Sequence, residues 1–258
     1  MPVGFEIIGG GGWIRIDRPE RLNALDATTL DDITGAIDAC CADSGIRSIV
    51  LIGEGGRAFS TGGDLKQLRQ DEIDGHPKRA EIAAERLYDR LRACPRPVVA
   101  AVDGHCLGAG FELALLSDIV VATEASQFGL SEVRFSLMPD AGLIELPRRI
   151  PANAARALLL TGQPISANRA YQLGLVAELA RDRAGMLERT ESLVASLALA
   201  APCAIAAYKQ VLSAGDVAAV DAARRERAKA WVSLAATRDR EEGLAAFLER
   251  RPPNWTGR

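Results

Sequence analysis

Two glycine-rich turns could place backbone amides and carboxylates around one reacting group. The first covers residues 60–65 (STGGDL) and the second residues 104–110 (GHCLGAG); each follows an apolar, β-like run and leads into a helix-like stretch. Turns of this kind can aim two backbone N–H groups at one point, as a developing oxyanion requires. Three acids, Glu112, Glu132 and Asp140, follow the second turn. The pattern indicates an enzyme that stabilises negative charge and moves protons.

The amides of Gly63 and Ala109 are the candidate donors, but each feature also has a purely structural explanation. Glycine usually marks turn geometry rather than binding. Glu112, in the first turn of a predicted helix, is also typical of a favourable charge at a helix N-terminus. Asp140 and Asp64 both precede predicted helices and are typical of N-cap residues. These alternatives stay open on the residues alone.

The surrounding elements predict an α/β fold. Short β-like runs recur at residues 13–16, 48–52, 97–102, 119–122 and 175–179. Helical spacing covers residues 29–42, with Asp26 as N-cap, and residues 78–93. Strands that alternate with helices favour a mainly parallel sheet.

The C-terminal part of the chain has a different pattern. Beyond about residue 182 the strand signal stops, and Ala-rich helices are predicted at residues 187–200, 203–213, 217–236 and 240–250. We therefore predict an α/β core over residues 1–195 and an all-helical region, suited to oligomerisation, over residues 196–258.

Composition excludes several function classes. The 258 residues include 31 basic and 34 acidic side chains, so no positive excess exists to hold nucleic acid or an anionic membrane. No signal peptide and no membrane-spanning apolar stretch are expected. Five cysteines without CxxC spacing suggest reduced thiols and a cytoplasmic protein. With His76 and His105 alone and no nearby ligand cluster, no metal is expected, and no dinucleotide fingerprint points to a cofactor.

Taken together, these motifs resemble those of the crotonase family, the enoyl-CoA hydratase/isomerase group. The matching stretches are residues 18–25, 58–68, 97–128, 161–167, 174–176 and 242–247. The resemblance covers nearly the whole chain. It implies a spiral of β-β-α units, a C-terminal all-helical trimerisation region and, commonly, a hexamer built from two trimers. It also implies an acyl-CoA thioester substrate bound without a metal or redox cofactor.

The resemblance assigns roles residue by residue. Gly63 and Ala109 look like the oxyanion-hole donors to the thioester carbonyl, and Glu112 and Glu132 match the two glutamates of the hydratases. We expect Glu112 to position and activate water and Glu132 to exchange a proton at C2. The positions that match CoA-binding residues are Leu22, Ala24, Gly63, Asp64, Leu65, Lys66 and Ala109.

Asp140 departs from the hydratase pattern, which normally has glycine there. A carboxylate at this position resembles the dienoyl-CoA isomerases, although those usually carry Asp where this chain has Glu112. The preferred prediction is an enoyl-CoA hydratase. An enoyl-CoA or dienoyl-CoA isomerase that uses Glu132 and Asp140 is the alternative, followed by another acyl-CoA reaction. A non-catalytic acyl-CoA binder is disfavoured, because a pure binder needs no paired carboxylates beside an acyl chain.

Overall fold

The computed structural model describes residues 2–76, 78–214 and 217–256, and within these ranges the strands form one sheet of six and one of four. The larger sheet has the order β1 (Val3–Ile8), β2 (Gly11–Ile16), β3 (Ser48–Gly53), β5 (Val98–Val102), β7 (Ile119–Thr123) and β10 (Glu178–Ala180). The smaller sheet has the order β4 (Ala58–Ser60), β6 (His105–Leu107), β8 (Gln127–Gly129) and β9 (Ile165–Ser166). All neighbouring strands are parallel except the β1–β2 and β8–β9 pairs.

The chain repeatedly places one strand in the larger sheet and the next in the smaller sheet. This happens at β3–β4, β5–β6 and β7–β8, and helices follow each pair. Because β4, β6 and β8 are parallel, their carboxyl ends lie at one edge of the smaller sheet. The segments that leave these strands contain Gly63, Ala109 and Glu132. The β-β-α repeat therefore gathers three of the candidate site residues.

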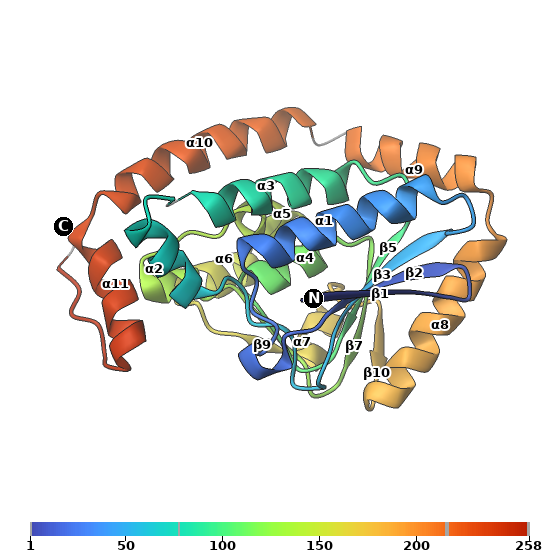
Figure 1. Ribbon diagram of the computed structural model, residues 1–258, viewed down its shortest axis with the longest axis horizontal. Helices are drawn as coiled ribbons and strands as arrows, with labels where there is room; N and C mark the ends of the chain where they lie inside the picture. Colours follow the sequence, from blue (N-terminus) through green and yellow to red (C-terminus); the bar gives the residue numbers. More distant parts are fainter. Residues whose placement is uncertain (1, 77, 215–216, 257–258) are drawn as a thin grey trace.

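Helices α1 (Ala27–Ala42), α4 (Ala109–Leu116) and α8 (Arg183–Leu199) pack against the larger sheet, with α8 on the opposite face from α1 and α4 (Figure 1). The other helices are α2 (Leu65–Ile73), α3 (Arg79–Arg92), α5 (Ala141–Arg149), α6 (Ala152–Thr161), α7 (Ala167–Gln172), α9 (Pro202–Ala214), α10 (Val217–Ala235) and α11 (Arg238–Glu249). Alternate residues of β3 serve the two faces: Ile49 and Leu51 belong to the core with α1, α3 and α4, whereas Val50 and Ile52 pack with α8.

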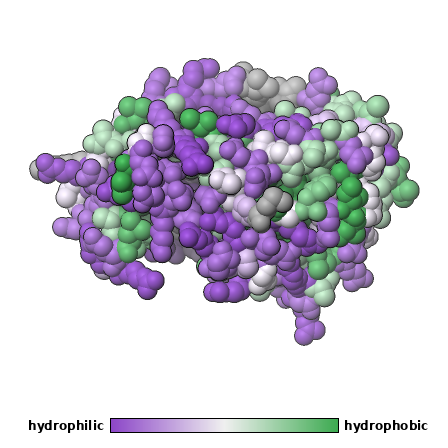
Figure 2. All heavy atoms as spheres, in the orientation of Figure 1, coloured by the Kyte–Doolittle hydropathy of each residue, from purple (hydrophilic) through white to green (hydrophobic). Residues whose placement is uncertain are grey.

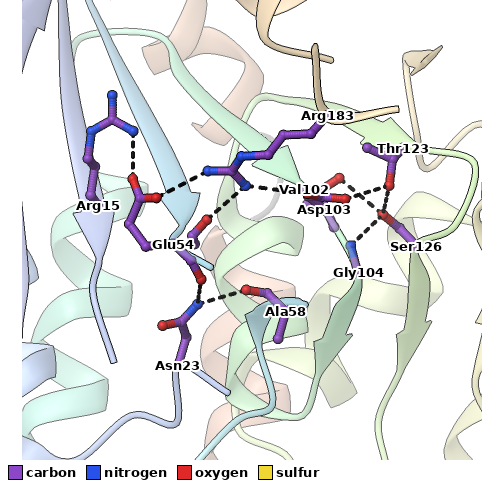
Figure 3. Close-up of polar contacts among 11 residues, drawn as sticks. Arg15, Asn23, Glu54, Ala58, Val102, Asp103, Gly104, Thr123, Ser126 and Arg183 are labelled. Atoms are coloured by element: carbon purple, nitrogen blue, oxygen red, sulfur yellow. Dashed lines mark hydrogen bonds and ion pairs between the residues drawn. The ribbon is translucent and has the colours of Figure 1, made fainter. Parts of the chain in front are cut away.

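A polar network joins the strand ends where the chain crosses between the sheets (Figure 3). Arg183, the first residue of α8, lies 3.3 Å from a carboxylate oxygen of Glu54 and 3.4 Å from one of Asp103. The fully buried Asn23 donates from Nδ2 to the carbonyl oxygens of Glu54, at 2.9 Å, and Ala58, at 2.7 Å. The Asn23 side chain thus gives hydrogen-bond partners to two main-chain carbonyls at the crossover, where buried backbone groups would otherwise be left unpaired.

Most predicted elements are present. The runs at residues 13–16, 48–52, 97–102 and 119–122 form β2, β3, β5 and β7, and Asp26 caps α1 by accepting the Thr29 amide at 2.8 Å. The predicted strand at residues 175–179 is wrong in position, because β10 begins only at Glu178. Leu175 is buried in the turn after α7, where its amide donates to the carbonyl of Ala170. Its apolar character reflects burial rather than strand pairing.

The C-terminal region contains the predicted helices as α8 to α11. The predicted boundary between residues 195 and 196 falls inside α8 and stays a prediction. Exposed apolar side chains lie at the end of α8, at Leu199, and in the second half of α9, at Tyr208, Val211 and Leu212. Figure 2 shows hydrophobic surface on the right of the molecule, where α8 and α9 meet. Among the described helices, none alone is long and apolar enough to cross a membrane. Helix α8 and residues 202–212 reach the required length and hydropathy only together, and the two segments are bent by 105° relative to each other.

Candidate active site

The first glycine-rich turn leaves the Gly63 amide outside the hydrogen-bond ladder. Here the chain forms a single parallel bridge between Leu25 and Gly63. The Leu25 amide donates to the carbonyl of Gly62 at 2.8 Å, and the Asp64 amide donates to the carbonyl of Leu25 at 2.9 Å. Position 62 requires glycine because its φ is +93°. A methyl group added at Gly63 would meet nothing within 4 Å, so this backbone faces open space.

The second turn brings the Ala109 amide beside the first. Ala109 is the first residue of α4, so its N–H has no acceptor within that helix. A Cβ atom added at Gly62 would lie 3.1 Å from the Ala109 nitrogen, so the two turns are in direct contact. Gly108 adopts φ +52° and donates its own amide to the carbonyl of Gly129 on β8. The turns are therefore packed together by close glycine contacts.

Both turns border one cavity of about 170 Å³. Its lining includes the predicted residues Gly63, Leu65, Ala109, Glu112, Glu132 and Asp140. Much of the remaining wall is apolar and includes Leu25, Leu30, Leu68, Ala84, Leu137 and Met138. Among the residues that the structure describes, no group of three or more His, Cys, Asp or Glu side chains could hold a metal ion.

Glu112 is held in a fixed orientation by two hydrogen bonds. One carboxylate oxygen accepts the Gly142 amide at 2.7 Å, and the other accepts the Tyr88 hydroxyl at 2.7 Å. The residue is only 3% exposed, and burial raises the pKa of its carboxyl, while the two donors act to lower that pKa. The carboxylate therefore sits at the cavity wall with both oxygens already oriented.

Sequence reasoning missed both partners of Glu112. Tyr88 lies on the buried face of α3. Because a buried tyrosine hydroxyl usually has a hydrogen-bond partner, a tyrosine on the apolar face of this helix was the signal from which a polar partner could have been predicted. Gly142 lies thirty residues beyond Glu112, and no local pattern links the two.

Glu132 sits in a different environment from Glu112. It begins a 3₁₀ helix, Glu132–Phe135. Its Oε2 atom is buried, and the described part of the chain offers it no hydrogen-bond partner. Burial, and secondly the charge of Glu112, raises the pKa of Glu132 to about 8. Glu132 is therefore mostly protonated at neutral pH and can donate a proton.

Asp140 is engaged by a residue from the far end of the chain. It occupies the N-cap position of α5, but its side chain makes no cap hydrogen bond. Its Oδ1 atom lies instead 2.9 Å from Nε of Arg227 on α10, and Arg227 also lies 3.6 Å from Glu85. Burial raises the pKa of Asp140, and the Arg227 guanidinium opposes that effect. The alternative role as an N-cap hydrogen-bond acceptor is therefore wrong.

The remaining predicted CoA-contact residues lie near the first turn but do not line the cavity. Asp64 caps α2 by accepting the Gln67 amide at 3.3 Å and forms ion pairs with Arg18 and Arg21 at 3.2 and 2.9 Å. The carbonyl of Leu22 accepts the amide of Thr61 at 3.2 Å, which ties the loop containing Leu22 to the turn. That loop also contains Ala24, while Lys66 is exposed on α2. Their contacts with CoA stay a prediction.

A family model described as enoyl-CoA hydratase/isomerase matches residues 9–258. This chain belongs to the enoyl-CoA hydratase/isomerase family. The predicted crotonase resemblance and fold class are thereby confirmed.

Relatives of this family resemble the chain over almost all of its length. A probable enoyl-CoA hydratase of Bacillus subtilis (strain 168) is 34% identical over 91% of each chain. A 2,3-dehydroadipyl-CoA hydratase of Escherichia coli (strain K12) is 35% identical over 95% of this chain and 94% of its own. The crystal structure of a carnitinyl-CoA hydratase from Mycobacterium avium superposes with a TM-score of 0.86 at 30% identity, covering 100% of this chain and 99% of that one.

Proposed function

We propose that this protein is an enoyl-CoA hydratase that adds water across the C2–C3 double bond of a 2-enoyl-CoA. One observation carries the proposal: a glutamate with both oxygens hydrogen-bonded and a second glutamate with a buried, unpartnered oxygen line the same cavity as the residues of the two candidate backbone amides. The relatives named as hydratases, at about 35% identity across the chain, support it. No metal or redox cofactor is needed for this chemistry.

The amides of Gly63 and Ala109 would bind the thioester oxygen. Attack of water at C3 moves negative charge onto that oxygen, forming a thioester enolate. Preorganised donors stabilise this charge without reorienting, and the loss of one such donor typically costs on the order of 3 kcal/mol in the transition state. The glycine contacts between the two turns supply the rigidity that this role requires.

The two glutamates would divide the proton transfers. Glu112, oriented by Tyr88 and Gly142, accepts a proton from the attacking water. Glu132, whose pKa of about 8 keeps it protonated at neutral pH, delivers a proton to C2 of the enolate. The mutual repulsion of two nearby carboxylates favours this state, in which one is charged and the other is neutral.

The isomerase alternative, with Glu132 and Asp140 as the proton-transfer pair, is not favoured. Relatives that are 34% and 35% identical over more than nine tenths of the chain carry hydratase names, and Asp140 is engaged in an ion pair with Arg227. An aspartate in that ion pair is a poorer proton donor than the protonated Glu132.

Hydration of crotonyl-CoA tests the proposal directly, because the conjugated enoyl thioester loses its ultraviolet absorbance when water adds. We expect Glu112→Gln and Glu132→Gln each to lower kcat by about 100-fold or more while the variants still bind the substrate. A wild-type protein that binds crotonyl-CoA without hydrating it would support the acyl-CoA binder instead. Double-bond migration with no hydration would support the isomerase.

We further propose that the protein assembles as a homotrimer or as a hexamer of two trimers. The exposed apolar side chains of Leu199, Tyr208, Val211 and Leu212 on the C-terminal helices support an interface there. Light scattering behind size exclusion should give a mass of three or six chains, and Val211→Glu should reduce it. A wild-type monomer at micromolar concentration would refute this assembly.

A further inference from the structure

Helices α1 and α3 lie side by side and run in the same direction (Figure 1). Two ion pairs set their register. Asp31 lies 3.1 Å from Arg86. Asp38, two turns further along α1, pairs with Arg90, one turn further along α3. Continuing along both helices, the next facing residues are Cys41, in the last turn of α1, and Cys94, just beyond α3. The register fixed by the ion pairs therefore places two thiols opposite each other.

The two sulfur atoms are 3.7 Å apart and share a hydrogen bond. Cys41 is partly exposed, whereas Cys94 is 1% exposed. A disulfide bond has an S–S length of about 2.05 Å, so a small side-chain movement would bring the sulfurs to bonding distance. An accessible thiol backed by a buried partner is the arrangement of a reacting cysteine and a resolving cysteine.

Positive charge surrounds the accessible thiol. Arg96 donates to the carbonyl oxygens of Cys41, at 3.2 Å, and Asp43, at 2.7 Å, which offsets the negative end of α1. The hydrogen bond from Cys94, and then the nearby guanidinium groups of Arg90 and Arg96, lower the pKa of Cys41 to about 6 against the opposing effect of burial. Thiolate formation, which nucleophilic attack requires, is therefore favoured at Cys41.

We propose that Cys41 and Cys94 form a dithiol site that is oxidised to an intramolecular disulfide by small-molecule disulfides. The Cys41 thiolate attacks one sulfur of the oxidant, breaks its S–S bond and releases one thiolate, leaving a mixed disulfide on Cys41. Cys94 then loses its proton, attacks the Cys41 sulfur and displaces the second thiolate. Two protein thiols are oxidised to one disulfide, and the oxidant is reduced to two thiols.

The cross-link would join two elements that border the acyl cavity. It would close a loop from residue 41 to residue 94 that contains the first glycine-rich turn, α2 and all of α3. Tyr88, the hydrogen-bond partner of Glu112, lies on α3 within this loop. Because a disulfide removes conformational freedom from the unfolded chain, oxidation should raise the melting temperature.

Oxidised glutathione is the probe, with the full-length protein in its native state. We expect wild-type protein to lose the mass of two hydrogen atoms, to retain no glutathione on this pair and to yield a Cys41–Cys94 cross-linked peptide. The melting temperature should rise by several degrees and return to its starting value with dithiothreitol. Iodoacetamide should alkylate Cys41 at least about tenfold faster than the buried Cys106.

Single-cysteine variants separate the two steps. Cys94→Ser should trap a stable glutathione adduct on Cys41, whereas Cys41→Ser should leave Cys94 unmodified because that thiol is buried. Cys203→Ser is the matched control, since Cys203 is exposed and distant in sequence, and it should still form the cross-link. The proposal is overturned if wild-type protein keeps glutathione on Cys41 without closing the bond, or if the cross-link forms at Cys40 instead.

Discussion

Nε of Arg227 lies 2.9 Å from Oδ1 of Asp140, and both residues line the cavity that Glu112 and Glu132 also line. Arg227 belongs to α10, and Asp140 lies at the start of α5, so the pair links the C-terminal helices to the catalytic core. Asp140, the third of the predicted catalytic acids, is thus held by a cation rather than left free for proton transfer.

Replacing Asp140 tests this reading of the ion pair. We expect Asp140→Asn to keep kcat for crotonyl-CoA hydration within about fivefold of wild type, because the residue does not carry a transferred proton. KM should rise modestly as Arg227 loses its partner. Glu132→Gln, assayed in parallel, should lose at least about 100-fold in kcat. If Asp140→Asn proves as inactive as Glu132→Gln, Asp140 takes part in the chemistry.

The proposed oxyanion donor at position 109 can be removed without breaking a helical hydrogen bond. Ala109 is the first residue of α4, where proline is tolerated because the N–H has no helical acceptor. We expect Ala109→Pro to fold with a melting temperature near that of wild type and to lose about 100-fold to 1000-fold in kcat. Ala109→Gly keeps the amide and should retain most activity. Similar kinetics for the two variants would remove this amide from the mechanism.

The raised pKa of Glu132 predicts a loss of activity at alkaline pH. Since the residue must be protonated to donate to C2, kcat/KM should fall as pH rises through about 8. A stopped-flow profile of crotonyl-CoA hydration from pH 5 to pH 10 would measure it. A profile that stays flat above pH 8 would mean that Glu132 acts in its ionised form.

The same pKa shift also links Glu132 to stability. A carboxyl whose pKa rises from 4.5 to about 8 on folding stabilises the native state fully below about pH 4.5, and this contribution is lost as pH rises through about 8. Relative to wild type, Glu132→Gln should therefore become more stable by about 3–4 kcal/mol between pH 5 and pH 9. Urea unfolding at the two pH values measures the difference, and equal shifts at both would contradict it.

Tyr88 should act through Glu112. Because its hydroxyl favours the ionised carboxylate, Tyr88→Phe should raise the pKa of Glu112 and move the acidic limb of kcat/KM to higher pH. We expect kcat at neutral pH to fall about threefold to thirtyfold. Tyr171→Phe alters an exposed tyrosine and should leave the profile unchanged. A lower kcat with an unmoved acidic limb would assign Tyr88 a packing role alone.

Asn23 should be important for stability rather than for chemistry. Its buried amide supplies hydrogen bonds to two carbonyls at the sheet crossover, and Asn23→Ala leaves them unsatisfied. We expect a loss of about 2–4 kcal/mol in the free energy of unfolding, measured in urea. Asn254→Ala, at an exposed position, should change that free energy by less than about 0.5 kcal/mol. Equal losses for the two variants would contradict the role given to the crossover network.

Local signals in the sequence were enough to predict the elements that are long or that begin with a capping residue. The caps at Asp26 and Asp64 and the apolar runs of β3 and β5 depend on neighbours within a few residues, so their patterns predict them correctly. The three-residue strands β4, β6 and β8 are too short to show any periodicity. The common edge at which the site residues meet was therefore visible only through the family resemblance.

Long-range partners had no signal in the sequence. Arg227 pairs with an acid 87 positions earlier, and nothing near either residue marks the pair. The same holds for the Gly142 amide that orients Glu112. The partner of each acid depends on such distant contacts and on burial, so residue types alone left Asp140 open as a catalyst.

The return of α10 to the cavity, where Arg227 and Trp231 form part of the wall, has a practical consequence. Truncating the chain before this helix would expose the cavity to bulk water and remove the ion-pair partner of Asp140. Exchanging the C-terminal helices between relatives would therefore also change the side chains that line this cavity.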